Sequence, residues 1–151
     1  MSDVRPGHLP VQGRARTLVL VALVIGSVMM VAYWAFWFAA RDVVASDTTQ
    51  SYVDFEDAFP LADAWVLLCL LGSIATLVRG SHAALFWLLV GAGAGIYLGC
   101  MDTLYDVEHG IWGNGAGGAI ELVIVTVTFV FSVSLLRWAW RRRHSLLDLE
   151  G

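Results

Sequence analysis

Residues 17–40 read TLVLVALVIGSVMMVAYWAFWFAA, a run of 24 residues without a charged side chain. An α-helix rises about 1.5 Å per residue, so roughly 20 apolar residues cross the ~30 Å hydrocarbon core of a bilayer. A cleaved signal peptide is the alternative, but its apolar region is only about 7–15 residues long and ends at a small-residue cleavage site. This run is longer and ends in bulky aromatic side chains, so we expect a retained first membrane span.

Three more segments along the chain have the same character, at about 60–78, 83–101 and 118–136. The second holds a single charge at Asp63, the third holds none, and the fourth holds only Glu121. Hydrophobic residues make up 58% of the 151-residue chain and charged residues 15%, with a mean hydropathy of +0.71. Soluble domains are about 45–50% apolar and about 25% charged. The sequence therefore predicts an all-α membrane protein with four transmembrane helices in an up-down bundle.

Three regions follow from these spans. Residues 1–16 are polar and contain two prolines and two glycines, which is typical of a disordered tail. Residues 17–136 form the predicted four-helix transmembrane domain, and residues 137–151 a basic tail. The connection RGSH at 79–82 is so short that the spans on either side of it must be antiparallel neighbours.

Arginine placement predicts the orientation, because loops on the cytoplasmic side of a membrane are enriched in Lys and Arg. The chain has no lysine, and with the N-terminus inside, eight of its nine arginines are cytoplasmic. The ninth is Arg41. We therefore expect a multi-pass protein of the cytoplasmic membrane with both termini inside (N-in/C-in). The eight predicted cytoplasmic arginines are Arg5, Arg14, Arg16, Arg79, Arg137, Arg141, Arg142 and Arg143.

The same orientation places most of the acidic residues outside. The predicted outer face carries a charge of −9 and the inner face +5, which together give the net charge of −4. Positive-inside selection does not require outer acids, so this face is either a solvating surface or a functional one. The outer acids are Asp42, Asp47, Asp54, Glu56, Asp57, Asp63, Asp102, Asp106, Glu108 and Glu121.

Asp63 and Glu121 are the two acids inside predicted spans. Each lies 16 residues before an arginine at the inner boundary, Arg79 or Arg137, so both sit at nearly the same depth, roughly 24 Å from that arginine. Charges within spans are rare and are candidates for function. The alternative is structural, because an acid in the first turn of a helix complements the positive end of the helix dipole.

Further candidate residues lie near these two acids or pack the helices. Thr128 and Ser132 share a helix face with Glu121, so we expect them to line a polar cleft. Gly91, Gly95 and Gly99 recur every four residues and predict close helix packing, within the bundle or between copies. The candidate residues for binding a ligand or cation are Asp63, Glu121, Asp102, Asp106, Glu56 and Asp57.

Aromatic residues gather at both predicted interfaces. Tyr33, Trp34 and Trp37, with two phenylalanines, crowd the outer end of the first span, and Trp138 and Trp140 flank the inner end of the fourth. Tyr and Trp favour the headgroup level because they combine an apolar ring with a polar tip. We therefore interpret these side chains as membrane anchors, with a stacking platform for a ligand as the alternative.

The sequence motifs of several common metal sites and enzyme classes are absent from this chain. Neither acidic loop has the spacing of an EF-hand calcium loop, and the chain has no converging set of His and Cys ligands for zinc. There is no CxxC, no nucleotide-binding motif and no nucleophile elbow. We expect no cofactor, while the identity of any metal stays open.

These observations favour a non-enzymatic binding, transport-accessory or sensor module. Its outward acidic site would take a cation, a cationic ligand or a partner protein. The alternative is a membrane-embedded enzyme, in which two carboxylates act as acid and base on a lipid or terpenoid substrate. A third possibility is an accessory subunit whose basic tail meets anionic headgroups. The expected partners are the lipid bilayer and a second copy or another membrane protein, with no nucleic acid.

Overall fold

The computed structural model describes residues 13–149, and the regular elements among these residues are all helical, with no strand. Four of the helices within these residues are long and apolar enough to cross a membrane, so the predicted all-α fold with four helices of membrane-spanning length is confirmed. In chain order the elements are α1 (Arg14–Ala39), α2 (Arg41–Val44), α3 (Gln50–Glu56), α4 (Pro60–Arg79), α5 (Ala83–His109), the 3₁₀ turn η1 (Ile111–Gly113), α6 (Gly115–Arg141) and α7 (Arg143–Leu147).

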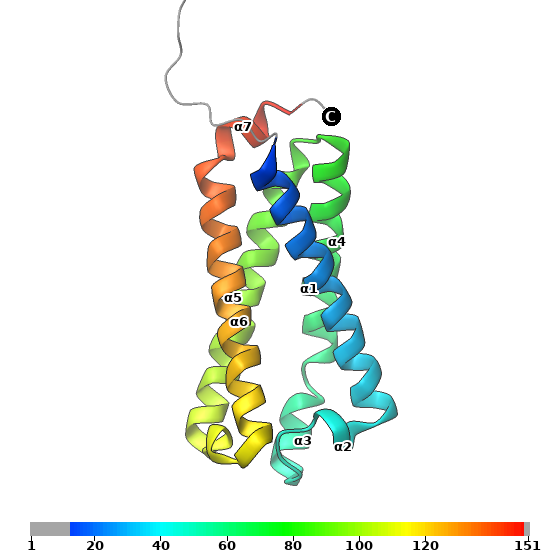
Figure 1. The fold of residues 1–151 in the computed structure, drawn as a ribbon, viewed down its shortest axis with the longest axis vertical. Coiled ribbons are helices and arrows are strands. Elements are labelled where there is room, and N and C mark those ends of the chain that lie inside the picture. The colour runs from blue at the N-terminus through cyan, green and yellow to red at the C-terminus, as the bar shows by residue number, and fades with distance from the viewer. Residues whose placement is uncertain (1–12, 150–151) are drawn as a thin grey trace, which may run out of the picture.

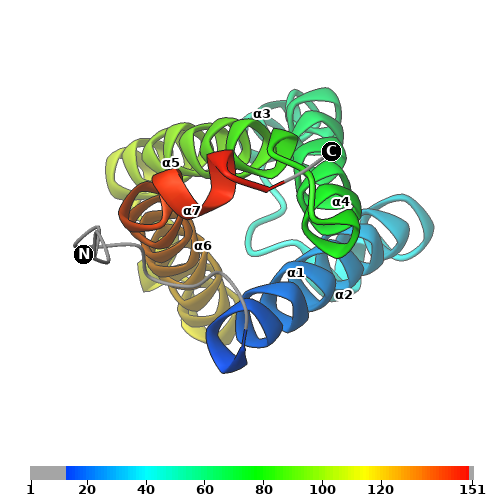
Figure 2. The same cartoon turned by 90° about the horizontal axis from the view of Figure 1, so that it is seen from above.

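The four long helices stand around a square in the order α1, α4, α5, α6 (Figure 2). α4 contacts α1 and α5, and α5 also contacts α6, whereas α1 and α6 make few direct contacts. The short elements lie at opposite ends of the bundle, α2 and α3 at one and α7 at the other (Figure 1). We call these the α3 end and the α7 end. The side of the square between α1 and α6 is thus the most open one.

The helix boundaries follow local stop and start signals. α4 has Pro60 at its first turn and is capped after Arg79 by Gly80, whose φ of 71° is a left-handed conformation that glycine adopts at no steric cost. α5 runs eight residues beyond the predicted span to His109 and ends in the same way at Gly110, with φ 66°. The acidic stretch 102–109 is therefore helical and extends the bundle at the α3 end.

The two predicted tails differ in part from the observed elements. α1 begins at Arg14, inside the predicted tail 1–16, and residues 1–12 lie outside the described residues. At the other end α6 continues to Arg141 and α7 follows within the predicted basic tail. α7 packs against α5 and α6, and its Leu146 is fully buried. The α7 end is thereby covered by an apolar contact.

α5 approaches its neighbours closely at the three glycines that sequence analysis selects. A Cβ at Gly91 would lie 2.9 Å from the Cβ of Cys69 on α4. A Cβ at Gly95 would meet the hydroxyl of Ser132 on α6, and one at Gly99 would lie 3.1 Å from a phenylalanine ring of α6. The small residues therefore lie where α5 packs against α4 and α6 within one chain.

Candidate functional site

Two carboxylates at the α3 end accept hydrogen bonds from aromatic side chains of α1. The hydroxyl of Tyr33 donates to Oε2 of Glu56 at 2.9 Å, and the indole Nε1 of Trp34 donates to Oδ2 of Asp63 at 2.9 Å. Glu56 is buried and lies on α3, whereas Asp63 is in the first turn of α4. Helix α1 thus supplies the donors that satisfy two acids on the segments beside it. The bond to Trp34 gives Asp63 a specific partner in addition to the helix dipole.

Two more candidate acids have a tryptophan donor. Nε1 of Trp37 donates to Oδ1 of Asp57 at 2.9 Å, and the guanidinium of Arg41 donates to the same oxygen at 3.0 Å. Asp57 is on the surface, with 44% of its side chain exposed. Asp106 of α5 is buried and accepts a hydrogen bond of 2.8 Å from Nε1 of Trp112. Asp57 is therefore a paired surface acid, whereas Asp106 belongs to the interior.

Glu121 is buried on α6, where the connection between α2 and α3 covers it. The hydroxyl of Ser46 donates to its Oε2 at 2.7 Å, and that of Tyr52 donates to the same oxygen at 3.4 Å. Ser46 also donates to the carbonyl of Gly117 at 3.3 Å, and a Cβ on Gly117 would lie 3.2 Å from the Cα of Ser46. Glycine at that position lets the connection reach the carboxylate.

Asp102 of α5 lies among the other candidate acids. It is within electrostatic reach of Glu56, Asp63, Asp106 and Glu121. Glu56 in turn interacts with Asp63, Asp106 and Glu121. Among residues 13–149 no hydrogen-bond donor contacts the Asp102 carboxylate. The structure therefore brings five of the six candidate binding acids into one group, which we call the acid cluster, and it leaves Asp102 as the member without a donor.

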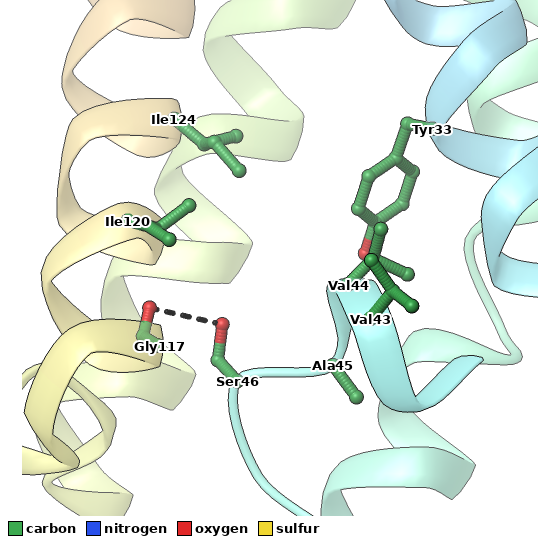
Figure 3. A pocket seen from close by; sticks show the side chains of 8 residues that line it. All are labelled: Tyr33, Val43, Val44, Ala45, Ser46, Gly117, Ile120 and Ile124. Atoms are coloured by element: carbon green, nitrogen blue, oxygen red, sulfur yellow. Dashed lines mark hydrogen bonds between the residues drawn. The ribbon is translucent and has the colours of Figure 1, made fainter. Parts of the chain in front are cut away.

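A cavity of about 130 Å³ adjoins the acid cluster on the side between α1 and α6 (Figure 3). Its two polar walls are the side chains of Tyr33 and Ser46, which donate to Glu56 and Glu121 respectively. Two carboxylates therefore stand directly behind the hydroxyls of the cavity. The lining residues are Tyr33, Val43, Val44, Ala45, Ser46, Gly117, Ile120 and Ile124.

The predicted polar cleft on α6 is not connected to the acid cluster by hydrogen bonds. Ser132 is buried, and its hydroxyl faces Gly95 in the contact between α5 and α6. Thr128 is half-buried one turn nearer the α3 end. Within residues 13–149 neither side chain bonds to a member of the acid cluster. Ser132 serves the packing of α5 on α6.

Three aromatic residues of α1 that the sequence pattern predicts as membrane anchors are hydrogen-bond donors to carboxylates in the structure. Tyr33, Trp34 and Trp37 stand at i, i+1 and i+4, on adjoining faces of α1, and they are the residues with polar tips near the end of an otherwise apolar helix. Acidic residues follow them within one connection. This combination of indole and phenol donors with nearby acids is the signal that could have identified the pairs.

Metal coordination requires ligands that converge on one point. Among residues 13–149 no group of three or more His, Cys, Asp or Glu side chains converges in this way. Cys69 and Cys100 are free thiols on separate helices. The carboxylates of the acid cluster are thus neighbours that do not converge on one point, and most of them accept a hydrogen bond from a neutral donor.

Protein-family models, curated proteins and solved structures were compared with this chain, and none of them matches it.

Proposed function

We propose that the α3 end binds a small organic cation, such as a protonated amine, at the cavity beside Glu56 and Glu121. The observation that carries this proposal is the excess of carboxyl groups over basic side chains in the acid cluster. Within residues 13–149, Arg41 is the arginine at this end, and it pairs with Asp57 outside the cluster. Since buried charges are stable only when they are paired, a cationic ligand supplies the missing partner.

The geometry favours an organic ammonium ion over a bare metal ion. The carboxylates do not converge as metal ligands among the described residues, and Tyr33 brings an aromatic ring to the cavity wall. Ammonium groups are held by carboxylates together with the faces of aromatic rings. A cavity of about 130 Å³ is close to the engineered 150 Å³ cavity that holds benzene, so the ligand has a few heavy atoms.

The flanks of the cavity favour entry from the membrane. Ile120 of α6 lines it and is largely exposed, at 60%. It lies on the side of the bundle where α1 and α6 make few contacts. Because exposed apolar side chains of a membrane helix face lipid, an amine with a short apolar chain reaches the carboxylates from the bilayer.

In the proposed orientation the bundle is an up-down bundle of the cytoplasmic membrane, with both termini inside and the α3 end outside. The distribution of arginines supports this orientation. Reporter fusions at Ser46 and Asn114 should then lie outside, and a fusion after Gly151 inside. A cytoplasmic signal from the fusion at Asn114 would show that the orientation is the reverse of the proposed one, while the geometry of the acid cluster would stay as described.

Ligand binding is tested with the full chain purified in mild detergent. Short alkylamines and tetramethylammonium are titrated by calorimetry, with sodium as the reference cation. Glu121→Gln should weaken amine binding roughly 30-fold or more, because it removes a buried charge partner. The matched control is Glu108→Gln, which removes an exposed acid on the same end and should leave affinity unchanged. Equal losses in both variants, or no amine binding at all, would contradict the proposal.

A membrane-embedded enzyme is the second candidate, and the apolar flank of the cavity favours it. A lipid or terpenoid chain could lie along Ile120 and Ile124 while Glu56 and Glu121 act as acid and base. The protein is incubated with co-purified membrane lipids, which are then analysed by mass spectrometry. Chemical conversion that is lost in Glu121→Gln supports the enzyme, whereas unaltered lipids together with amine binding support the binding module.

A further inference from the structure

The α7 end has a groove that the acid cluster does not involve. It has a volume of about 350 Å³ and is lined by Ser134, Arg137, Trp138, Arg141 and Arg142. The first four are spaced i, i+3, i+4 and i+7, so they lie on one face of α6. The groove therefore runs along the last two turns of a membrane-spanning helix.

The groove presents hydrogen-bond donors. Arg137 and Arg141 are exposed, and neither forms an ion pair within residues 13–149. The Nε1 of Trp138 is buried and has no hydrogen-bond partner in the same part of the chain. The guanidinium of Arg142 lies 5.7 Å from the centroid of the Trp138 ring. Guanidinium groups donate hydrogen bonds and cannot accept them, so the exposed side chains of Arg137 and Arg141 make the groove complementary to an anion.

An apolar stripe continues from the groove toward the middle of α6. Val130 and Val127 lie one and two turns before Ser134 on the same face, and both are well exposed, at 61% and 55%. A ligand that follows this face has a charged head at the arginines and an apolar tail along the valines. A free phosphate ion would leave the valines uncovered, whereas a phospholipid would cover both parts.

We propose that this groove binds the phosphate group of an anionic phospholipid, with its acyl chains along Val127 and Val130. The guanidinium groups of Arg137 and Arg141 match the oxygens of a phosphate, which arginine can bind through two parallel hydrogen bonds. Tryptophan favours the depth of the headgroups, and basic pockets at the ends of membrane helices suit anionic headgroups. The site is independent of the acid cluster and of the orientation of the bundle.

The test measures lipid retention on the full chain by native mass spectrometry, during titration with phosphatidylglycerol or phosphatidylcholine. Wild-type protein should retain phosphatidylglycerol in preference to phosphatidylcholine. The double variant Arg137→Gln/Arg141→Gln should weaken the retention of phosphatidylglycerol at least roughly 30-fold, because it removes the charge-assisted hydrogen bonds to the phosphate. The charge-matched control is Arg79→Gln/Arg143→Gln, since neither residue lines the groove. It should retain the lipid within about threefold of wild type.

Two further comparisons complete the test. The first distinguishes a specific site from general attraction to surface charge, and the second distinguishes a lipid from a soluble phosphate compound. Equal weakening in the two double variants would overturn the proposal, because general surface charge then explains the retention. Binding of glycerol phosphate as tightly as phosphatidylglycerol would overturn the lipid assignment.

Discussion

The two ends of the bundle are held together by different interactions. At the α3 end, Tyr33, Trp34 and Trp112 each donate a hydrogen bond to a carboxylate on another segment or turn. At the α7 end, Leu77, Leu88 and Leu146 are fully buried in one apolar cluster. A polar group taken below the surface needs a specific partner, whereas an apolar one needs only close neighbours. The α3 end therefore combines hydrogen-bonded pairs with a small apolar cluster of Trp37, Tyr52 and Ile111, whereas the three leucines at the α7 end are held by apolar packing.

Connection length accounts for part of this difference. Three residues join α4 to α5 at the α7 end, whereas the chain from Ala40 to Phe59 lies at the α3 end and folds into two short helices. Only a long connection can bring side chains such as Ser46 and Tyr52 to a carboxylate on α6. The tight connection instead forces its two helices together.

The largest expected effect comes from the apolar packing of the α7 end. Leu146 is fully buried, whereas its neighbour Leu147 is 55% exposed. Leu146→Ala should lower the free energy of unfolding by about 3 kcal/mol, because it leaves a cavity among buried side chains. Leu147→Ala is the matched control and should cost less than about 0.5 kcal/mol. Unfolding in detergent measures both values, and equal losses would show that α7 does not stabilise the bundle.

A slightly smaller effect is expected where α6 begins at the α3 end. A Cβ on Gly118 would meet the carbonyl oxygen of Ile111 and lie 2.9 Å from the carbonyl carbon of Trp112. Gly118→Ala should lower the unfolding free energy by about 2 kcal/mol, since backbone must move. Gly93 has open space around it, so Gly93→Ala should be neutral or stabilising. Thermal unfolding of the two alanine variants tests this pair, and a tolerated Gly118→Ala would mean that the corner is loosely packed.

The pairing that distinguishes the α3 end is tested by a double-mutant cycle. Trp34→Phe and Asp63→Ala each remove one partner of the 2.9 Å hydrogen bond between α1 and α4. Their coupling free energy should be about 1 kcal/mol, as found for side-chain bonds between membrane helices. Trp65→Phe, which changes an exposed tryptophan on α4, should show no coupling to Asp63→Ala. Zero coupling between Trp34 and Asp63 would leave the helix dipole as the reason for the acid.

The smallest expected effect concerns the surface pair beside the acid cluster. The side chains of Arg41 and Asp57 are 37% and 44% exposed, and the guanidinium of Arg41 also lies 4.6 Å from the centroid of the Trp37 ring. Arg41→Gln should cost about 0.5 kcal/mol, because solvent and salt screen exposed charges. Chemical unfolding at low and high salt checks this value. A loss above about 2 kcal/mol would require that Arg41 stabilises the whole cluster rather than one surface acid.

Parts of the candidate site were predictable from spacing alone. The count of residues to Arg79 and Arg137 predicts a similar depth for Asp63 and Glu121, and in the structure both acids lie within electrostatic reach of Asp102. The donors were not predictable in this way, because Trp34 and Ser46 are 29 and 75 residues from the acids that they contact. Residues separated by that many positions lie on different helices, so the periodicity of a single helix does not predict which of them meet.

The amino-acid sequence by itself determined that this protein has four helices long and apolar enough to cross a membrane, and that most of its carboxylates lie in the segments at one end of them. Hydropathy and the spacing of charges are local properties, and the bilayer fixes helix length without reference to neighbouring helices. The tertiary structure decided which side chain satisfies each acid, that Asp102 has no donor within residues 13–149, and that a cavity opens between α1 and α6. Those features depend on how helices rotate and tilt against one another, and that geometry is set by packing between residues distant in the chain.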